Sequence, residues 1–153
     1  MKMAMTIGRA LGSSERGQAL AEMALIAPLL LFLLVGLVEV GRYANFSILV
    51  SNAARAGVQY GAQNLVTAAD NVGMQNAATA DANLGATMTA TGSHICKCAD
   101  GSASTCLPTD CASSHRLVYV QVDTVATFNS MLHVANIVPS LQIRGHAVMR
   151  AAQ

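Results

Sequence analysis

One carboxylate, that of Glu22, lies near the start of a long apolar segment. Residues 23–38 contain no charged or strongly polar side chain. An ionisable side chain costs about 2.5–3.5 kcal/mol at the centre of a membrane helix, and less near its edge. The residues alone suggest one explanation for Glu22, in which its carboxylate extends towards lipid headgroups.

Four cysteines form a second group of reactive side chains, because they fall close together in the sequence. They are Cys96, Cys98, Cys106 and Cys111. A bridge between the first two would be strained, so we expect each of them to pair with one of the last two; the sequence leaves the connectivity open. The alternative is a zinc site that includes His94 or His115, although the C-x-C-x7-C-x4-C spacing lacks the paired C-x2-C motifs of common structural sites.

The remaining polar residues predict no enzyme. The histidines are scattered along the chain, at His94, His115, His133 and His146. The chain has no Gly-x-Ser-x-Gly elbow, no phosphate-binding loop and no His-Glu-x-x-His motif. Its formal net charge of +1 provides no basic patch for nucleic acid. We therefore expect a non-enzymatic protein with no cofactor, no metal and no nucleic-acid partner.

The apolar segment has the length of a membrane-spanning helix. Residues 19–38 would extend about 30 Å as a helix, which matches the hydrocarbon core of a bilayer. The preceding segment has an excess of basic residues, with Lys2, Arg9 and Arg16 against Glu15. The positive-inside rule then places the N-terminus in the cytoplasm and the rest outside, where disulfides persist. A cleaved secretory signal is the alternative, but no good cleavage site follows the segment.

Apolar and small residues continue at spacings of three and four beyond this segment. They are Phe46, Leu49, Val50, Ala53, Gly57, Tyr60 and Gly61. This stripe predicts one helix over residues 18–63, with its second part covering a small domain. Thr67 followed by Asp70 resembles a capping box, and predicts that a further helix starts there and runs to about Leu84.

Three later segments alternate in the manner of strands: residues 86–96, 116–128 and 141–149. Residues 129–140 join the last two and are expected to contain a helical turn. The predicted fold class is α+β, a long N-terminal transmembrane helix continuing into an extracytoplasmic domain with a small antiparallel sheet. We expect a leader (1–17), a transmembrane helix (18–41), a helical extension (42–84) and a β domain (85–153) with a Cys-rich loop (94–115).

The residues around Glu22 resemble the processing site of type IV pilins and pseudopilins. A basic leader ends in Gly17, and Glu22 is the fifth residue of a chain that starts at Gln18. Residues 16–63 resemble the TadE-like family of tight-adherence (Flp) pilus systems, with an Arg-Gly start, the glutamate, a proline in the apolar run, a Glu-x-Gly-Arg exit and an Asn-Ala-Ala-Arg-x-Gly helix. The C-terminal GHAVMRA is similar to the family's closing strand. Met23 departs from the aromatic residue usual in processed pseudopilins.

The resemblance implies a minor pilin or pseudopilin that helps to assemble or anchor a Flp-type pilus for adhesion. A prepilin peptidase of the aspartic type would cut between Gly17 and Gln18, and Glu22 would pair with the new terminal amine of a neighbouring subunit. The implied partners are this peptidase, other pilins, the inner-membrane assembly platform and the lipid bilayer. The implied location is the bacterial inner membrane, single-pass, with the N-terminus inside, or the pilus itself.

Two alternatives to this role remain. The first is an uncleaved single-pass membrane protein whose outer domain binds a partner in a secretion or envelope complex. The second is a secreted enzyme released by ordinary signal peptidase. One reaction also bears on the pairing itself: a terminal Gln18 that cyclised to pyroglutamate would lose the positive charge proposed to neutralise Glu22.

Overall fold

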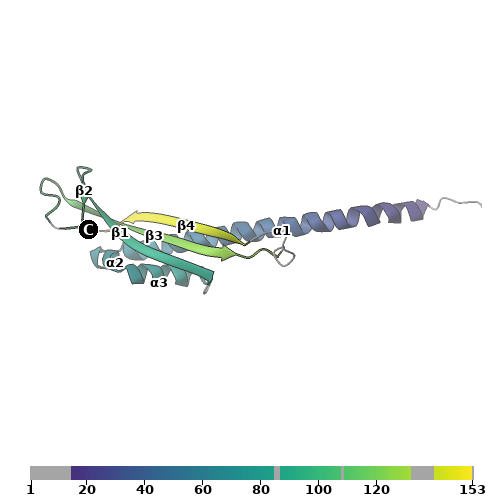
Figure 1. Ribbon diagram of the computed structural model, residues 1–153, viewed down its shortest axis with the longest axis horizontal. Coiled ribbons are helices and arrows are strands. Elements are labelled where there is room, and N and C mark those ends of the chain that lie inside the picture. The colour runs from purple at the N-terminus through teal and green to yellow at the C-terminus, as the bar shows by residue number, and fades with distance from the viewer. Residues whose placement is uncertain (1–14, 85–86, 108, 132–139, 153) are drawn as a thin grey trace, which may run out of the picture. The chain divides into compact units, whose positions relative to one another are not determined.

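The computed structural model describes residues 15–84, 87–107, 109–131 and 140–152, and its contacts divide the chain into two compact units, residues 1–38 and 39–153. The helices are α1 (Glu15–Gly61), α2 (Leu65–Ala69) and α3 (Asn71–Ala82) (Figure 1). The strands are β1 (Met88–Cys98), β2 (Ala103–Ser104), β3 (Arg116–Phe128) and β4 (Leu141–Arg150). A long apolar helix followed by short helices and an antiparallel sheet confirms the predicted α+β class.

The helix α1 contains the segment that the sequence identifies as membrane-spanning. Its most apolar stretch has a mean hydropathy of 2.6 and is not buried. Leu, Ile and Phe side chains on an isolated helix are costly in water and favourable in lipid, where a helix also satisfies its own backbone groups. These properties indicate a single-pass membrane protein. Its bounds, Glu15 and Gly61, lie within three residues of those predicted.

The four strands pair antiparallel in the order β2-β1-β3-β4. β1 pairs with β3 along its whole length, and β4 pairs with residues 119–128 of β3. The predicted strands are thus confirmed to within two residues at each end. The prediction of three strands is wrong by one, because the two-residue β2 also pairs with Cys96 and Lys97. Of the predicted helical turn at 129–140, residues 132–139 lie outside the described residues.

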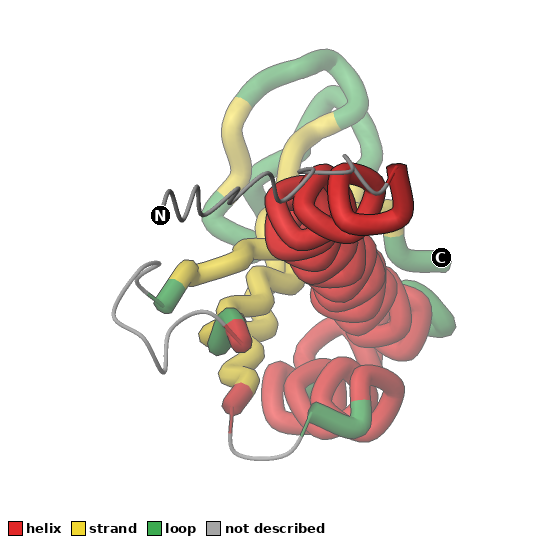
Figure 2. The backbone as a smooth tube through the Cα atoms, turned by 90° about the vertical axis from the view of Figure 1, so that its right-hand side faces the viewer, coloured by secondary structure: helices red, strands yellow, loops and turns green. Residues whose placement is uncertain are grey.

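Helices cover one face of the sheet and leave the other open. Along β3, every second residue from Val118 to Phe128 is buried, while the residues between them are half-buried. The buried set packs with side chains from the second part of α1, from α2 and from α3. Figure 2 shows the backbones of the strands in yellow and those of the helices in red. The principal helix residues in these two clusters are Val50, Ala53, Val58, Ala68, Met74 and Ala78. The alternation read from the sequence therefore predicts the two faces correctly.

The second part of α1 approaches the sheet closely at Gly145 in β4. A Cβ atom on Gly145 would lie 2.6 Å from the backbone oxygen of Val50 and 2.5 Å from the hydroxyl oxygen of Thr124. The same Thr124 hydroxyl donates a hydrogen bond of 2.8 Å to the Val50 carbonyl. Thr124 is fully buried, so this bond satisfies a polar group that would otherwise be costly in the core. Gly145 and Thr124 together thus set the distance between α1 and the sheet.

The two short helices are capped by side chains. Asn64 accepts hydrogen bonds from two backbone N–H groups of α2, each 2.9 Å long, and the Thr67 hydroxyl accepts the N–H of Asn64 at 3.1 Å. Asp70 caps α3 by accepting the N–H of Gly73 at 2.8 Å, and it also accepts the hydroxyl of Tyr60 at 2.9 Å. The prediction that Thr67 opens the second helix is wrong. Asn64, a preferred N-cap residue, starts a separate short helix before it.

Candidate assembly site and disulfide-bonded loop

The predicted processing and assembly residues lie together at the start of α1. Gly17, Gln18 and Glu22 are all helical and exposed. Four residues rise about 6 Å along a helix, so Glu22 lies one turn beyond Gln18 on the same face. The Gln18 side-chain amide donates a hydrogen bond of 3.2 Å to the Glu22 carboxylate, from Nε2 to Oε1. Within one chain, Glu22 therefore has a neutral partner that contributes no opposite charge.

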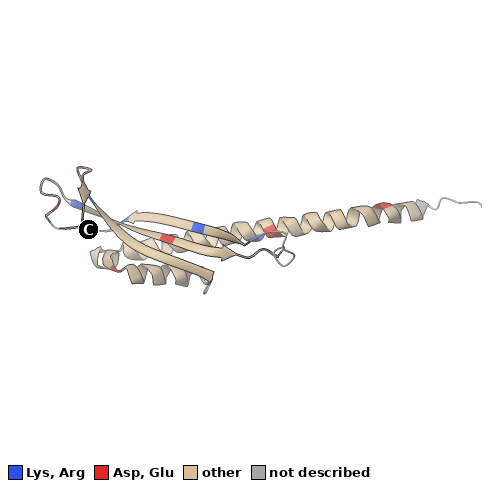
Figure 3. Ribbon diagram, viewed as in Figure 1, with Lys and Arg blue, Asp and Glu red and all other residues tan. Residues whose placement is uncertain are grey.

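The side chains around Glu22 are apolar and exposed to solvent. Leu20, Met23 and Leu25 are each more than half exposed. Figure 3 shows the long stretch of α1 beyond Glu22 that carries no lysine, arginine, aspartate or glutamate. A carboxylate at the edge of such a surface loses part of its hydration when the surface enters lipid or meets another helix. An opposite charge supplied from outside the chain would compensate for that loss.

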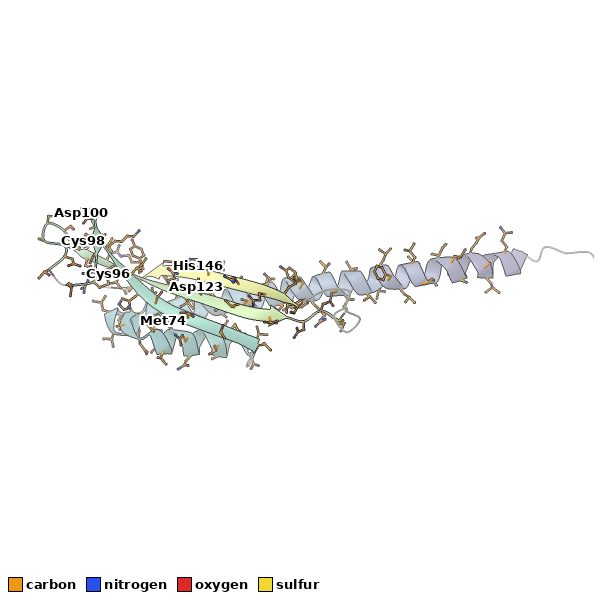
Figure 4. All side chains as sticks on the ribbon, in the orientation of Figure 1. Met74, Cys96, Cys98, Asp100, Asp123 and His146 are labelled. Atoms are coloured by element: carbon orange, nitrogen blue, oxygen red, sulfur yellow. A yellow bond between two sulfur atoms is a disulfide. The ribbon has the colours of Figure 1, made fainter. Side chains whose placement is uncertain are left out.

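All four cysteines form disulfides. Cys96 is bonded to Cys106 and Cys98 to Cys111, with Cα–Cα distances of 5.1 and 5.5 Å. The prediction that each of the first two pairs with one of the last two is confirmed. Cys96 and Cys98 lie in β1 rather than in the loop that follows it, as their labels in Figure 4 show. With no free cysteine, the zinc alternative loses its thiolate ligands.

Asp110 organises the segment that the two disulfides close. Its Oδ2 accepts hydrogen bonds from the Thr105 N–H at 2.6 Å, from the Thr105 hydroxyl at 2.8 Å and from the Ser104 hydroxyl at 3.0 Å. These bonds, led by that from the Thr105 hydroxyl, hold the pKa of the Asp110 carboxyl below its usual value. Arg116 donates a further bond to the Cys106 carbonyl. The Asp110 carboxylate and the Arg116 guanidinium therefore help to fix the loop, in addition to its bridges.

A carboxylate and a histidine pair on the open face of the sheet. Asp123 on β3 lies opposite His146 on β4, and Oδ1 is 2.7 Å from Nδ1 (Figure 4). The amide of Gln121 donates to the other carboxylate oxygen at 2.9 Å. This amide first, and then His146, lower the pKa of the Asp123 carboxyl. Both side chains are about half exposed, so the pair contributes little stability.

Three of the four histidines lie in the part of the chain that the structure describes, and these three do not assemble with acids or cysteines into a metal site. Over the described residues, no group of three His, Cys, Asp or Glu side chains could hold a metal ion. His94, His115 and His146 lie on β1, in the disulfide-bonded loop and on β4. His133 falls outside the described residues.

Glu39 and Arg42 form a further group of contacts, although in the sequence their positions predict only the end of the apolar segment. Glu39 accepts the backbone N–H of Met131 at 3.0 Å, and Arg42 donates to its other oxygen at 2.9 Å. The Arg42 guanidinium also lies 5.5 Å from the centre of the Phe128 ring. No local pattern predicts a contact between Glu39 and Met131, because the two residues are 92 positions apart.

Comparison with known proteins is informative for α1. No curated protein and no solved structure matches the chain. A protein-family model does match, over residues 17–59, and its description is "TadE-like protein". The matched segment starts at Gly17, contains Glu22 and extends through most of the stripe that packs on the sheet. The match confirms the resemblance drawn from the sequence over residues 17–59, which makes this segment similar to the TadE-like family of Tad pilus-related proteins.

Proposed function

We propose that this protein is a minor pilin or pseudopilin of a Flp-type pilus, cut after Gly17 and assembled through Glu22. It would insert with its N-terminus in the cytoplasm and its sheet domain (residues 39–153) outside. A prepilin peptidase would remove residues 1–17, and the assembly platform would then combine the protein with other pilins. The observation that carries this proposal is the exposed Glu22 carboxylate, one helical turn from Gln18 on an apolar helix, with a neutral partner in its own chain.

The proposed role of Glu22 is to set the register between neighbouring helices. Cleavage after Gly17 creates an ammonium group at Gln18, and the Glu22 carboxylate of a neighbouring subunit can approach it. In a medium of low dielectric constant, the pair is attractive while each charge alone is penalised. A shift of one turn along the helix would separate the charges by about 5.4 Å. The pair therefore favours one relative height of adjacent subunits.

The geometry adds a consequence of pyroglutamate formation. In that reaction, the Gln18 α-nitrogen attacks the side-chain Cδ, and the side-chain nitrogen leaves as ammonia. The nitrogen lost is Nε2, the atom that donates to Glu22. Cyclisation would therefore remove both the ammonium group and the intrahelical partner of the carboxylate. We expect the assembling form of the protein to carry a free or N-methylated terminal amine.

The first test is the intact mass of the membrane-extracted protein, produced with and without its own prepilin peptidase. We expect a chain that starts at Gln18 only when the peptidase is present. The same mass distinguishes a free amine from cyclisation and from N-methylation. A full-length chain under both conditions would refute the processing step. It would favour the second candidate, an uncleaved membrane anchor whose outer domain binds a partner.

The second test replaces Glu22 by Gln. Because the neutral amide is cheaper to place in lipid, membrane insertion should be unchanged, while the yield of pili should fall at least tenfold. The matched control is Asp81→Asn, which removes an exposed carboxylate from α3 and should leave assembly unchanged. Normal pili from Glu22→Gln would exclude the register role.

A further inference from the structure

An exposed apolar group lies at the end of the sheet domain that contains Glu39. It is termed the base cluster and consists of Val40, Tyr43, Phe128, Met131 and Leu141. Four of these side chains are open to solvent: Val40 is 66% exposed, Met131 59%, Tyr43 44% and Leu141 41%. They come from α1, from the segment after β3 and from the start of β4. Three separate parts of the chain thus present apolar side chains at one end of the domain.

The members of the base cluster are held in place by one another. The rings of Tyr43 and Phe128 meet edge to face with centroids 5.7 Å apart, and Phe46 contacts the same Phe128 ring at 5.5 Å. A shallow pocket of about 140 Å³ lies between Val40, Tyr43, Phe128 and Leu141. The cluster is therefore a shaped apolar surface rather than a set of isolated exposed residues.

The charges beside the base cluster are already neutralised within the domain. Both carboxylate oxygens of Glu39 are engaged, one by the Met131 N–H and the other by Arg42. Arg42 also lies over the Phe128 ring. Charged groups that are paired and hydrogen-bonded lose less free energy when water is replaced by a less polar medium. Glu39 and Arg42 can therefore enter such a medium while each keeps its partner.

The sequence places this end of the domain at a membrane surface. Glu39 directly follows residues 19–38, whose length as a helix matches the hydrocarbon core. Tyr43 is one helical turn beyond it, about 6 Å along the axis. Tyrosine and arginine are residue types that occupy the boundary between acyl chains and headgroups. Covalent continuity with the apolar helix thus identifies lipid as the medium that meets the base cluster.

We propose that the base cluster is a lipid-contact site that seats the sheet domain in the interfacial layer of the bilayer. Leu141 and Met131 contact the first methylene groups of phospholipid acyl chains, and Arg42 and Tyr43 lie at the level of the headgroups. The domain then rests on the membrane instead of standing away from it on a free helix. This proposal rests on the membrane insertion of α1, and does not depend on cleavage at Gly17 or on the role of Glu22.

The test uses tryptophan fluorescence, because the natural chain contains no tryptophan. Leu141→Trp places one reporter in the base cluster, and Ile95→Trp is the matched control. Ile95 is 42% exposed, against 41% for Leu141. The two residues lie opposite Tyr119 and Phe128 of the same strand, which are nine residues and about 30 Å apart along β3.

Each full-length variant is reconstituted in phosphatidylcholine vesicles at a low protein-to-lipid ratio, with acyl chains brominated near the headgroup. We expect at least threefold stronger quenching, and a more blue-shifted emission, for Leu141→Trp than for Ile95→Trp. Equal and weak quenching of both would overturn the proposal. Met131→Trp repeats the measurement from a second element, so that one poorly folded variant does not decide the outcome.

A second copy of the chain is the competing occupant of the base cluster. In that case, quenching by lipid would fall and the blue shift would persist as the protein-to-lipid ratio is raised, and that result would also overturn the proposal. Failure here would leave the pilin role untouched, since neither the peptidase nor a pilus is needed for the measurement. A positive result would not establish the pilin role either.

Discussion

The two disulfides allow a quantitative prediction, because their loops are short and overlap. The bonded cysteines are 10 residues apart in one bridge and 13 in the other. The chain-entropy relation assigns about 2.8 kcal/mol to closing the first loop in the unfolded state and about 3 kcal/mol to the second. Because residues 98–106 belong to both loops, a single bridge keeps most of the segment closed, and each removal taken alone costs less than its full value.

The perturbation is the double variant Cys98→Ala with Cys111→Ala, which removes one bridge without leaving a free thiol. We expect the free energy of unfolding of the sheet domain to fall by about 2–3 kcal/mol. For a domain of this size, each kcal/mol lowers the midpoint by about 4 °C, so the shift is about 8–12 °C. The assay is thermal unfolding of the full-length protein in detergent micelles, followed by circular dichroism of the strands. The control is Ala112→Ser, a change at an exposed loop position.

The disulfide connectivity is checked by proteolysis of the unreduced protein. Trypsin cuts after Lys97, between the first two cysteines, and Asp-N protease cuts before Asp100 and Asp110. Together they place the four cysteines on four peptides. We expect peptide 81–97 linked to 100–109, and peptide 98–99 linked to 110–116. The opposite linkage would refute the connectivity, and a double variant that melts within about 2 °C of the natural protein would refute the entropic reasoning.

Two further predictions concern the packing of α1 and the carboxylate in the loop. Gly145→Ala forces a Cβ atom against the Val50 carbonyl, so it should lower the free energy of unfolding by about 1–3 kcal/mol. The control is Val148→Ala, on the open face of the same strand, which should change this free energy by no more than about 0.5 kcal/mol. Equal melting temperatures for the two variants would refute the close approach of α1 to β4. Asp110 has a folded-state pKa below its unfolded value of about 3.8, so its stabilisation is complete above that value and is lost as the pH falls through the folded-state pKa. The excess of the natural protein's melting temperature over that of Asp110→Asn should therefore be larger at pH 6 than near pH 3, and a difference that is the same at both pH values would contradict this assignment.

Much of the architecture was predictable because its signals are local. Residues 116–128 alternate strictly, and this pattern predicts both the strand and the face that the helices cover. The apolar stripe from Phe46 to Gly61 likewise predicts the part of α1 that packs on the sheet. Each signal is a period of 2 or 3.6 residues within one element. It can be read without knowing which other element packs against that element. Elements with long periodic patterns were accordingly located to within a few residues.

The features that were missed depend on partners distant in sequence or on competition between nearby residues. β2 is two residues long and carries no period of its own. Glu39 binds the Met131 N–H only because the end of β3 returns to α1, and cysteine spacing cannot choose between Cys106 and Cys111 as the partner of Cys96. The helix start near Thr67 was misplaced because Asn64, three residues earlier, caps a short helix first. In each case the sequence supplied the residue type, and the tertiary structure decided its contact.

The first and second parts of α1 are suited to different environments. Its fully buried contacts with the sheet begin at Val50, far along the chain from the proposed cleavage site after Gly17. Removal of a leader there would change the charge at the start of the helix without touching the core of the domain. The residues between, from Gln18 to Val38, carry one charge, and the most apolar stretch of α1 is not buried in the structure. These residues must therefore contact lipid or neighbouring helices. They can exchange lipid contacts for contacts with other subunits while the disulfide-bonded domain stays folded.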